Sequence, residues 1–91
     1  MAGSIWVADL KISQATNDKI CGKHGISGQE VKDALVCVAG LVFVWDDDAE
    51  RGLRAIVSAF IRQPVLVVIR PRPRDAYGDS WTLVSAYPIG H

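Results

Sequence analysis

The sequence predicts an α+β fold, in which an N-terminal short strand and a helical hairpin pack on a four-stranded antiparallel sheet. Apolar residues recur at helical spacing up to Gly40, and from Leu41 onward the pattern changes to that of strands. Strands that are joined by short connections pair antiparallel, and the first strand can extend the sheet at one edge. A chain of 91 residues has room for one core, so we expect a single domain over residues 1–91.

The first two elements are a strand over Ile5–Ile12 and a helix directly after it. Ser13 is a residue type that favours helix N-caps. Gly25 supplies the left-handed conformation with which many helices end, so we expect the first helix to end at His24.

The second helix has the most specific local signature of the chain. Ser27-Gly28-Gln29-Glu30 matches the S-x-x-E capping box, and Ile26 and Val31 have the spacing of a hydrophobic staple. We expect this helix to end at Gly40, which makes the two helices a hairpin with a very short connection.

Four further strands are predicted from apolar runs that are bounded by turn residues, at Leu41–Trp45, Arg51–Arg62, Val65–Arg70 and Ser80–Tyr87. The acidic run Asp46–Asp48 is interpreted as a solvated turn. Val65–Arg70 is the most apolar strand and is expected at the centre of the sheet.

Side-chain alternation in the last strand predicts that Trp81, Leu83, Ser85 and Tyr87 share one face. Because both helices are expected on one side of the sheet, the other side should be partly open. We expect Arg54, Ser58 and Arg62 on that open side, and Ser85 and Tyr87 are candidates to join them from the last strand.

The charge is balanced overall, with 10 basic and 10 acidic residues and a formal net charge of zero. A neutral chain is not a strong general binder of polyanions, because that affinity depends on lysines and arginines that neutralise phosphates. Arginines nevertheless crowd one later stretch, so a basic patch on one side is compatible with the neutral sum. These residues are Arg62, Arg70, Arg72 and Arg74.

Several classes of protein receive no support from the sequence. Cys21 and Cys37 do not have the spacing of metal ligands, and we expect two reduced thiols inside helices. There is no Walker, G-x-G-x-x-G or H-E-x-x-H motif, so we expect neither a metal nor a cofactor. No signal peptide and no membrane-length apolar run is visible, so we expect a cytoplasmic protein without a membrane partner.

The polar residues are compatible with metal-independent cleavage of RNA. That reaction needs a base for the 2′-hydroxyl proton, an acid for the leaving 5′-oxygen and cations for the phosphate. His24 is a candidate base or acid, and Tyr87 is a candidate acid. Candidates for the phosphate contacts are Arg54, Arg62 and Arg70, and candidates for stacking on unpaired bases are Tyr77, Trp81 and Tyr87. The same residues also have ordinary structural interpretations, as a helix end, strand packing and solubilising charges.

One stretch resembles a known toxin family. Asn17–Val31 (NDKICGKHGISGQEV) is similar to the N-x-x-K-H-G-[IV]-[ST]-x-x-E segment of BrnT-type toxins. Glu50-Arg51-Gly52 and the apolar Val65–Ile69 follow in the order of that family. Trp81–Tyr87 (WTLVSAY) stands where BrnT-type toxins have a strand with Ser-Ala-Arg, and Tyr87 replaces the arginine.

The resemblance implies a RelE-like fold, endoribonuclease activity and the role of toxin in a type II toxin–antitoxin system. Ser85-Ala86-Tyr87-Pro88 is also similar to the [ST]-x-Y-[PT] ending of the barnase/EndoU/colicin/RelE nuclease group. In that group, a Ser or Thr and a Tyr of the last strand serve catalysis together with an earlier His. The resemblance therefore implies catalytic roles for His24, Ser85 and Tyr87.

The sequence thus predicts a site, partners and two alternatives. The expected catalytic residues are His24, Ser85, Tyr87 and Arg54, and the expected RNA-binding or phosphate-binding residues are Lys23, Arg62, Arg70 and Trp81. The expected partners are an RNA substrate and a cognate antitoxin, with which the chain can form a hetero-oligomer. The alternatives are a non-catalytic protein- or RNA-binding module of the same fold, and a domain that oligomerises through an apolar sheet edge.

Overall fold

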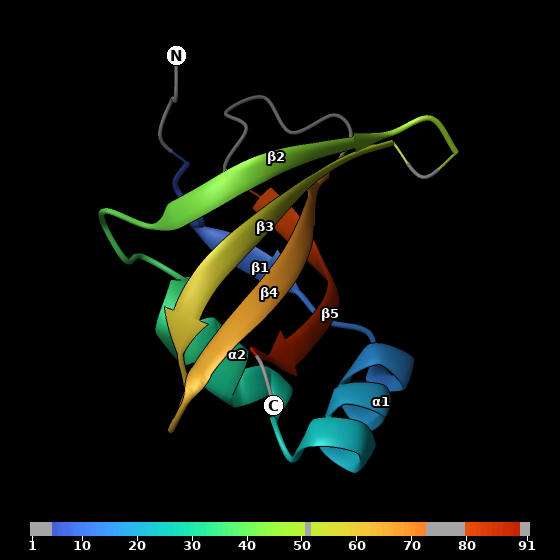
Figure 1. Cartoon of the computed structure of the whole chain (residues 1–91), viewed down its shortest axis with the longest axis vertical. Coiled ribbons are helices and arrows are strands. Elements are labelled where there is room, and N and C mark those ends of the chain that lie inside the picture. The colour runs from blue at the N-terminus through green and yellow to red at the C-terminus, as the bar shows by residue number, and fades with distance from the viewer. Residues whose placement is uncertain (1–4, 51, 73–79, 90–91) are drawn as a thin grey trace.

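The structure is a computed structural model, and it describes residues 5–50, 52–72 and 80–89. These residues form two helices and one sheet of five strands in the order β1-β5-β4-β3-β2 (Figure 1). The elements are β1 (Asp9–Lys11), α1 (Gln14–His24), α2 (Gly28–Leu35), β2 (Val42–Asp48), β3 (Gly52–Phe60), β4 (Pro64–Pro71) and β5 (Ser80–Pro88). The predicted α+β class is confirmed.

The sheet is mixed and has five strands, so the prediction of four antiparallel strands was incomplete. Strands β2 to β5 pair antiparallel, whereas β1 pairs parallel with β5, with Leu10 opposite Trp81. Leu10 is buried in the core, which explains why so short a strand stays on the sheet. β4 occupies the centre of the sheet, as its apolar sequence predicted.

Both predicted helix starts are confirmed by their caps. The Ser13 hydroxyl accepts a hydrogen bond from the Thr16 amide at 3.1 Å, and α1 ends at Gly25 with a φ of 67°. At α2, the Ser27 hydroxyl accepts from the Glu30 amide while the Glu30 carboxylate accepts from the Ser27 amide at 3.0 Å. This reciprocal pair is the capping box.

The second helix ends at Leu35, and the predicted end at Gly40 was wrong. Val36 has an extended backbone and forms a parallel bridge with Val7. The Cys37 amide then donates to the Val7 carbonyl at 2.8 Å. Tertiary pairing with the N-terminal segment therefore replaces the last helical turn.

The helices and the inward-pointing strand residues bury one face of the sheet. In Figure 1, α2 lies behind β3 and β4, on the far side of the sheet from the viewer. Fully buried side chains come from both helices and from the central strands, and they include Ile20, Val31, Leu35, Val57, Val65, Val67 and Ile69. Burial of this apolar surface is the main stabilising contribution to such a fold.

Two predictions about the strands are corrected by the observed register. Asp46, Asp47 and Asp48 belong to β2 and are not a turn, since they pair with Arg54, Leu53 and Gly52 of β3. The second correction concerns β5, where Trp81, Leu83, Ser85 and Tyr87 were expected on one face. Val68 of β4 pairs with Ser85 of β5, but the next residue, Ile69, pairs with Leu83, so Val84 is an extra residue in a β-bulge.

The remaining features concern thiols, metals and membranes. Cys21 lies in α1 but Cys37 lies beyond α2, and both are free, exposed thiols. Over the described part of the chain, no cluster of His, Cys, Asp and Glu has the geometry of a metal site. Neither of the two described helices has the length and apolar character needed to cross a membrane.

Candidate functional site

The side of the sheet that faces away from the helices carries most of the predicted polar residues. We call this side the open face, and it consists of the outward side chains of β2, β3, β4 and β5. Val42, Val44 and Phe60 on this face are 69%, 62% and 70% exposed. The described residues therefore leave this part of the sheet in contact with solvent.

The strand register places two arginines side by side on the open face. Arg54 lies opposite Asp46 of β2, and Arg70 lies opposite Thr82 of β5. Ala55 pairs with Ile69, so the preceding Arg54 and the following Arg70 are neighbours on β3 and β4. These four residues form a polar row across the sheet, which we call the arginine row.

The two arginines of this row differ in their surroundings. Arg54 forms an ion pair with Asp46, and its side chain is only 17% exposed. Its Nε is buried and has no hydrogen-bond partner within the described structure. The Arg70 side chain is exposed. Arg54 is thus held in place by a neighbouring carboxylate, whereas Arg70 is available to an incoming anion.

Two more rows follow along the strands. The next row consists of Val44, Ile56, Val68 and Ser85, and the last consists of Val42, Ser58, Leu66 and Tyr87. Leu66, the partner of Tyr87, is four residues from Arg70 on β4, which corresponds to about 13 Å along a strand. Arg70 and Tyr87 can therefore contact one extended ligand that lies along β4 and β5.

The bulge at Val84 is what brings Ser85 and Tyr87 to the open face. Strict alternation would place both side chains with Trp81 and Leu83, which are buried in the core. The extra residue reverses the alternation, so that Leu83 and Ala86 point inward while Ser85 and Tyr87 point outward. Bulges often redirect a side chain next to a functional site.

Arg62 lies elsewhere, although it was predicted on the open side. It follows the end of β3 with a φ of 63°, and its guanidinium donates to the Gly25 carbonyl at 2.7 Å. It also forms an ion pair with Glu30 of α2. Arg62 therefore ties the end of β3 to the helical hairpin.

Glu30 shows the electrostatic effect of these contacts. The hydrogen bond from the Ser27 amide and the positive charge of Arg62 together lower the pKa of the Glu30 carboxyl below its ordinary value. Partial desolvation opposes this shift. The lowered pKa reflects the capping box and the ion pair, which are both structural features.

His24 and Lys23 occupy the last turn of α1, where positive charge is favoured by the helix dipole. His24 is half-buried and Lys23 is exposed. No hydrogen bond or ion pair of the described structure joins either side chain to Arg54, Arg70, Ser85 or Tyr87.

Trp81 belongs to the core and not to the exposed surface. Its side chain is 3% exposed, and its ring stacks on Trp45 with a centroid distance of 6.0 Å. Its Nε1 donates to the Trp6 carbonyl at 3.1 Å. A base from solvent cannot stack on a ring that is buried in this way. Tyr77 and Arg74, which were also candidates, lie outside the described residues.

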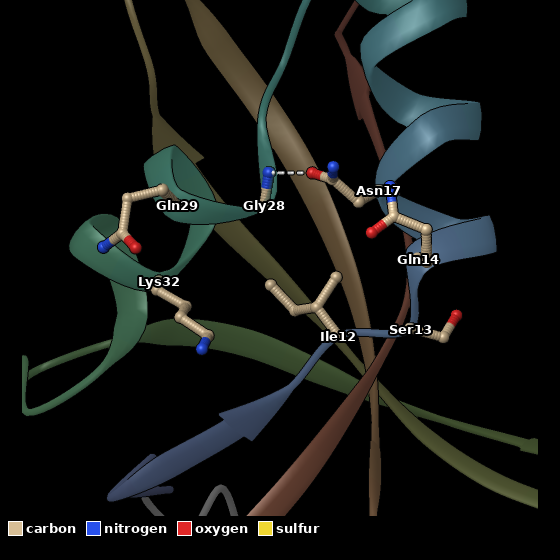
Figure 2. Close-up of a pocket in the computed structure, with 7 residues that line it drawn as sticks. All are labelled: Ile12, Ser13, Gln14, Asn17, Gly28, Gln29 and Lys32. Atoms are coloured by element: carbon tan, nitrogen blue, oxygen red, sulfur yellow. Dashed lines mark hydrogen bonds between the residues drawn. The ribbon is translucent and has the colours of Figure 1, made fainter.

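A separate pocket of about 200 Å³ lies where the N-termini of the two helices meet (Figure 2). The side chain of Asn17 spans this junction and accepts a hydrogen bond from the Gly28 amide at 2.7 Å. The Thr16 and Glu30 amides already donate to the capping serines. Because these helix-end donors are used internally, the pocket is a structural junction between the helices.

The polar open-face residues that the sequence did not predict there are Asp46 and Thr82. Asp46 was assigned to a turn, and its pairing with Arg54 requires a hairpin register that continues through the acidic run. Ser58 lies on the open face, as the sequence predicted. The sequence contains no clear signal for Thr82, because its position depends on strand pairing.

The comparisons with known proteins give no relatives. No family model, no curated protein and no solved structure matches this chain.

Proposed function

We propose that this chain is a metal-independent endoribonuclease of the BrnT/RelE kind, which acts as the toxin of a type II toxin–antitoxin pair in the cytoplasm. Single-stranded RNA would bind along the open face. The observation that carries the proposal is that Arg54, Arg70, Ser85 and Tyr87 share this face. The resemblance of Asn17–Val31 and of the Ser85-Ala86-Tyr87-Pro88 ending to the toxin and nuclease families supports it independently.

The proposed reaction is an internal transesterification of RNA. A base takes the proton from a 2′-hydroxyl, and that oxygen forms a bond to phosphorus. The bond from phosphorus to the 5′-oxygen then breaks, and this oxygen receives a proton from an acid. The products are a 2′,3′-cyclic phosphate and a free 5′-hydroxyl.

The exposed Arg70 is the proposed phosphate contact, because its guanidinium can pair with two phosphate oxygens at once. Arg54 adds positive charge beside it and is oriented by Asp46. Tyr87 is the proposed acid, and the Ser85 hydroxyl is a hydrogen-bond donor between the two. His24 is the only histidine among the described residues and stays the candidate base.

Because the chain has a formal net charge of zero, we expect it to neutralise only a few phosphates when it binds RNA. Binding of single-stranded nucleic acid weakens with salt with a log–log slope of about −0.7 for each neutralised phosphate. If Arg54 and Arg70 are the two cationic contacts, the expected slope is about −1.4. A slope several times steeper would place binding on a different and more basic surface.

The test is induced expression in bacteria of the wild-type chain and of Tyr87→Phe and Arg70→Ala, with Lys19→Ala as a control in an exposed position of α1. We expect growth arrest and cleaved cellular RNA from wild type and Lys19→Ala only. Arrest by folded Tyr87→Phe and Arg70→Ala at the wild-type level would refute the assigned site.

The apolar residues of the open face favour a second candidate, which is a non-catalytic protein-binding module. Val42 and Val44 are exposed, and Ile56 and Leu66 are half-buried on the same face. An apolar surface of this kind is typical of protein interfaces. Soluble, folded wild type that neither arrests growth nor cleaves RNA would support this candidate over the nuclease.

A further inference from the structure

The two edges of the sheet differ in how well they are protected from pairing with another chain. The β1 edge is three residues long, and its outward residues Asp9 and Lys11 are charged and exposed. Short length and charged side chains are common means by which proteins prevent edge-to-edge association. The β1 edge is therefore protected.

The β2 edge lacks this protection along its first half. Within the described structure, β2 pairs only with β3, and the register is unbroken from Val42 to Asp48. Val42–Trp45 contains no proline, no lysine and no bulge, although Val42, Val44 and Trp45 are all exposed. An edge of this kind presents unpaired amide and carbonyl groups that fit an additional strand.

We propose that the chain forms a two-fold symmetric dimer in which β2 pairs antiparallel with β2 of a second copy, centred on Phe43. In this register Val42 lies opposite Val44 of the second copy, and Phe43 lies opposite Phe43. The proposal concerns the sheet edge and is independent of the proposed nuclease activity.

The distribution of charge selects this orientation and register. Asp46 and Asp47 lie at one end of β2, and parallel pairing would place them beside the same residues of the second copy. Like charges directly opposite each other destabilise a strand pair. Antiparallel pairing about Phe43 moves the two acidic segments to opposite ends of the seam, where Asp46 lies beyond Val42, the first residue of the second copy's strand.

The apolar pattern explains why a second copy fits this edge. A partner strand must be apolar on both of its faces, because Val42 and Val44 lie on the open face while Phe43 and Trp45 lie on the other. The same four residues of a second copy supply this pattern. A two-fold axis perpendicular to the sheet then places both open faces on the same side of one continuous ten-stranded sheet.

The test is sedimentation velocity of the full chain over about 1 to 500 μM, with Val44→Lys as the edge variant. Phe60→Lys is the matched control, because Phe60 is equally exposed on the open face but lies on β3. We expect wild type and Phe60→Lys to be dimers, and Val44→Lys to raise the dimer Kd by at least about tenfold, which corresponds to about 1.4 kcal/mol.

Circular dichroism verifies that each variant is folded, and Val42→Lys replaces Val44→Lys if the latter does not fold. A wild-type monomer at all concentrations would overturn the proposal. Dissociation by Phe60→Lys to the same degree as by Val44→Lys would also overturn it, because the contact would then be the open face and not the edge.

Discussion

The two faces of the sheet differ in what they carry, since one holds the apolar core and the other holds exposed polar side chains. The inner face is a continuous apolar layer in which Val57, Val67 and Ile69 are fully buried beneath the helices. The open face carries one polar row and two rows that mix apolar and polar residues, and its strands contribute Arg54, Arg70, Ser85 and Tyr87. Polar groups can be placed on a sheet at little cost when the opposite face supplies the core. The difference indicates that substitutions on the two faces should have separable effects.

The largest expected difference between the faces is in packing. Leu35→Ala removes a fully buried side chain of α2 and should lower the free energy of unfolding by about 2–5 kcal/mol. Phe60→Ala, on the open face and outside the proposed β2 seam, should change it by less than about 1 kcal/mol, because Phe60 is mostly exposed. Urea unfolding of both variants measures this comparison. Equal losses would show that the open face is covered in solution.

The next effect concerns the one ion pair of the described open face. Asp46→Ala leaves the largely buried Arg54 guanidinium without its carboxylate partner and should cost about 1–3 kcal/mol. Asp47→Ala is the control, since Asp47 is exposed on the opposite face of the same strand, and it should stay within about 0.5 kcal/mol. Thermal unfolding at neutral pH distinguishes the two variants. A neutral effect of Asp46→Ala would mean that Arg54 is not oriented by Asp46.

A smaller effect is expected at the capping box, on the helical side of the molecule. Ser27→Ala should cost about 1 kcal/mol, because the Glu30 amide loses its acceptor.

The pKa of Glu30 is lowered in the folded state, so its stabilising contribution is complete above the ordinary glutamate pKa and is lost as the pH falls through the folded value. As the pH falls through that range, Glu30→Gln should therefore lose less free energy of unfolding than the wild type. Identical pH profiles for both proteins would contradict this assignment.

The smallest effect on stability is expected where the effect on activity is largest. Tyr87→Phe and Arg70→Ala should each change the free energy of unfolding by less than about 0.5 kcal/mol, because both side chains point to the open face. Loss of the proposed acid should nevertheless reduce RNA cleavage by about 10²–10⁴-fold. Unfolding and cleavage measured on the same preparations test this separation. A large loss of stability would indicate that Tyr87 is a packing residue.

The sequence predicted the elements whose signals are local. The caps at Ser13 and Ser27 and the end of α1 at Gly25 follow from residue types at fixed spacing. The central position of β4 follows from its continuous apolar run. The fold class followed from the change in apolar period after Gly40.

The errors have tertiary causes. The end of α2 depends on pairing between Val36 and Val7, and the parallel position of β1 depends on its contact with β5. The bulge at Val84 shifts the side-chain alternation by one residue, which exchanges the two faces of a strand. The grouping of Ser85 and Tyr87 with Trp81 and Leu83 was therefore wrong, and so was the placement of Arg62 on the open side.

The proposed function depends on the binding of RNA to the open face. The most direct measurement is an NMR titration of the full chain with a short single-stranded oligoribonucleotide that carries 2′-O-methyl groups and cannot be cleaved. If RNA binds the open face, chemical-shift changes should be concentrated at Arg54, Arg70, Ser85 and Tyr87, with little change at Gln29 and Lys32 in the helical pocket. Changes confined to the helical side, or no change at high oligonucleotide concentration, would contradict it.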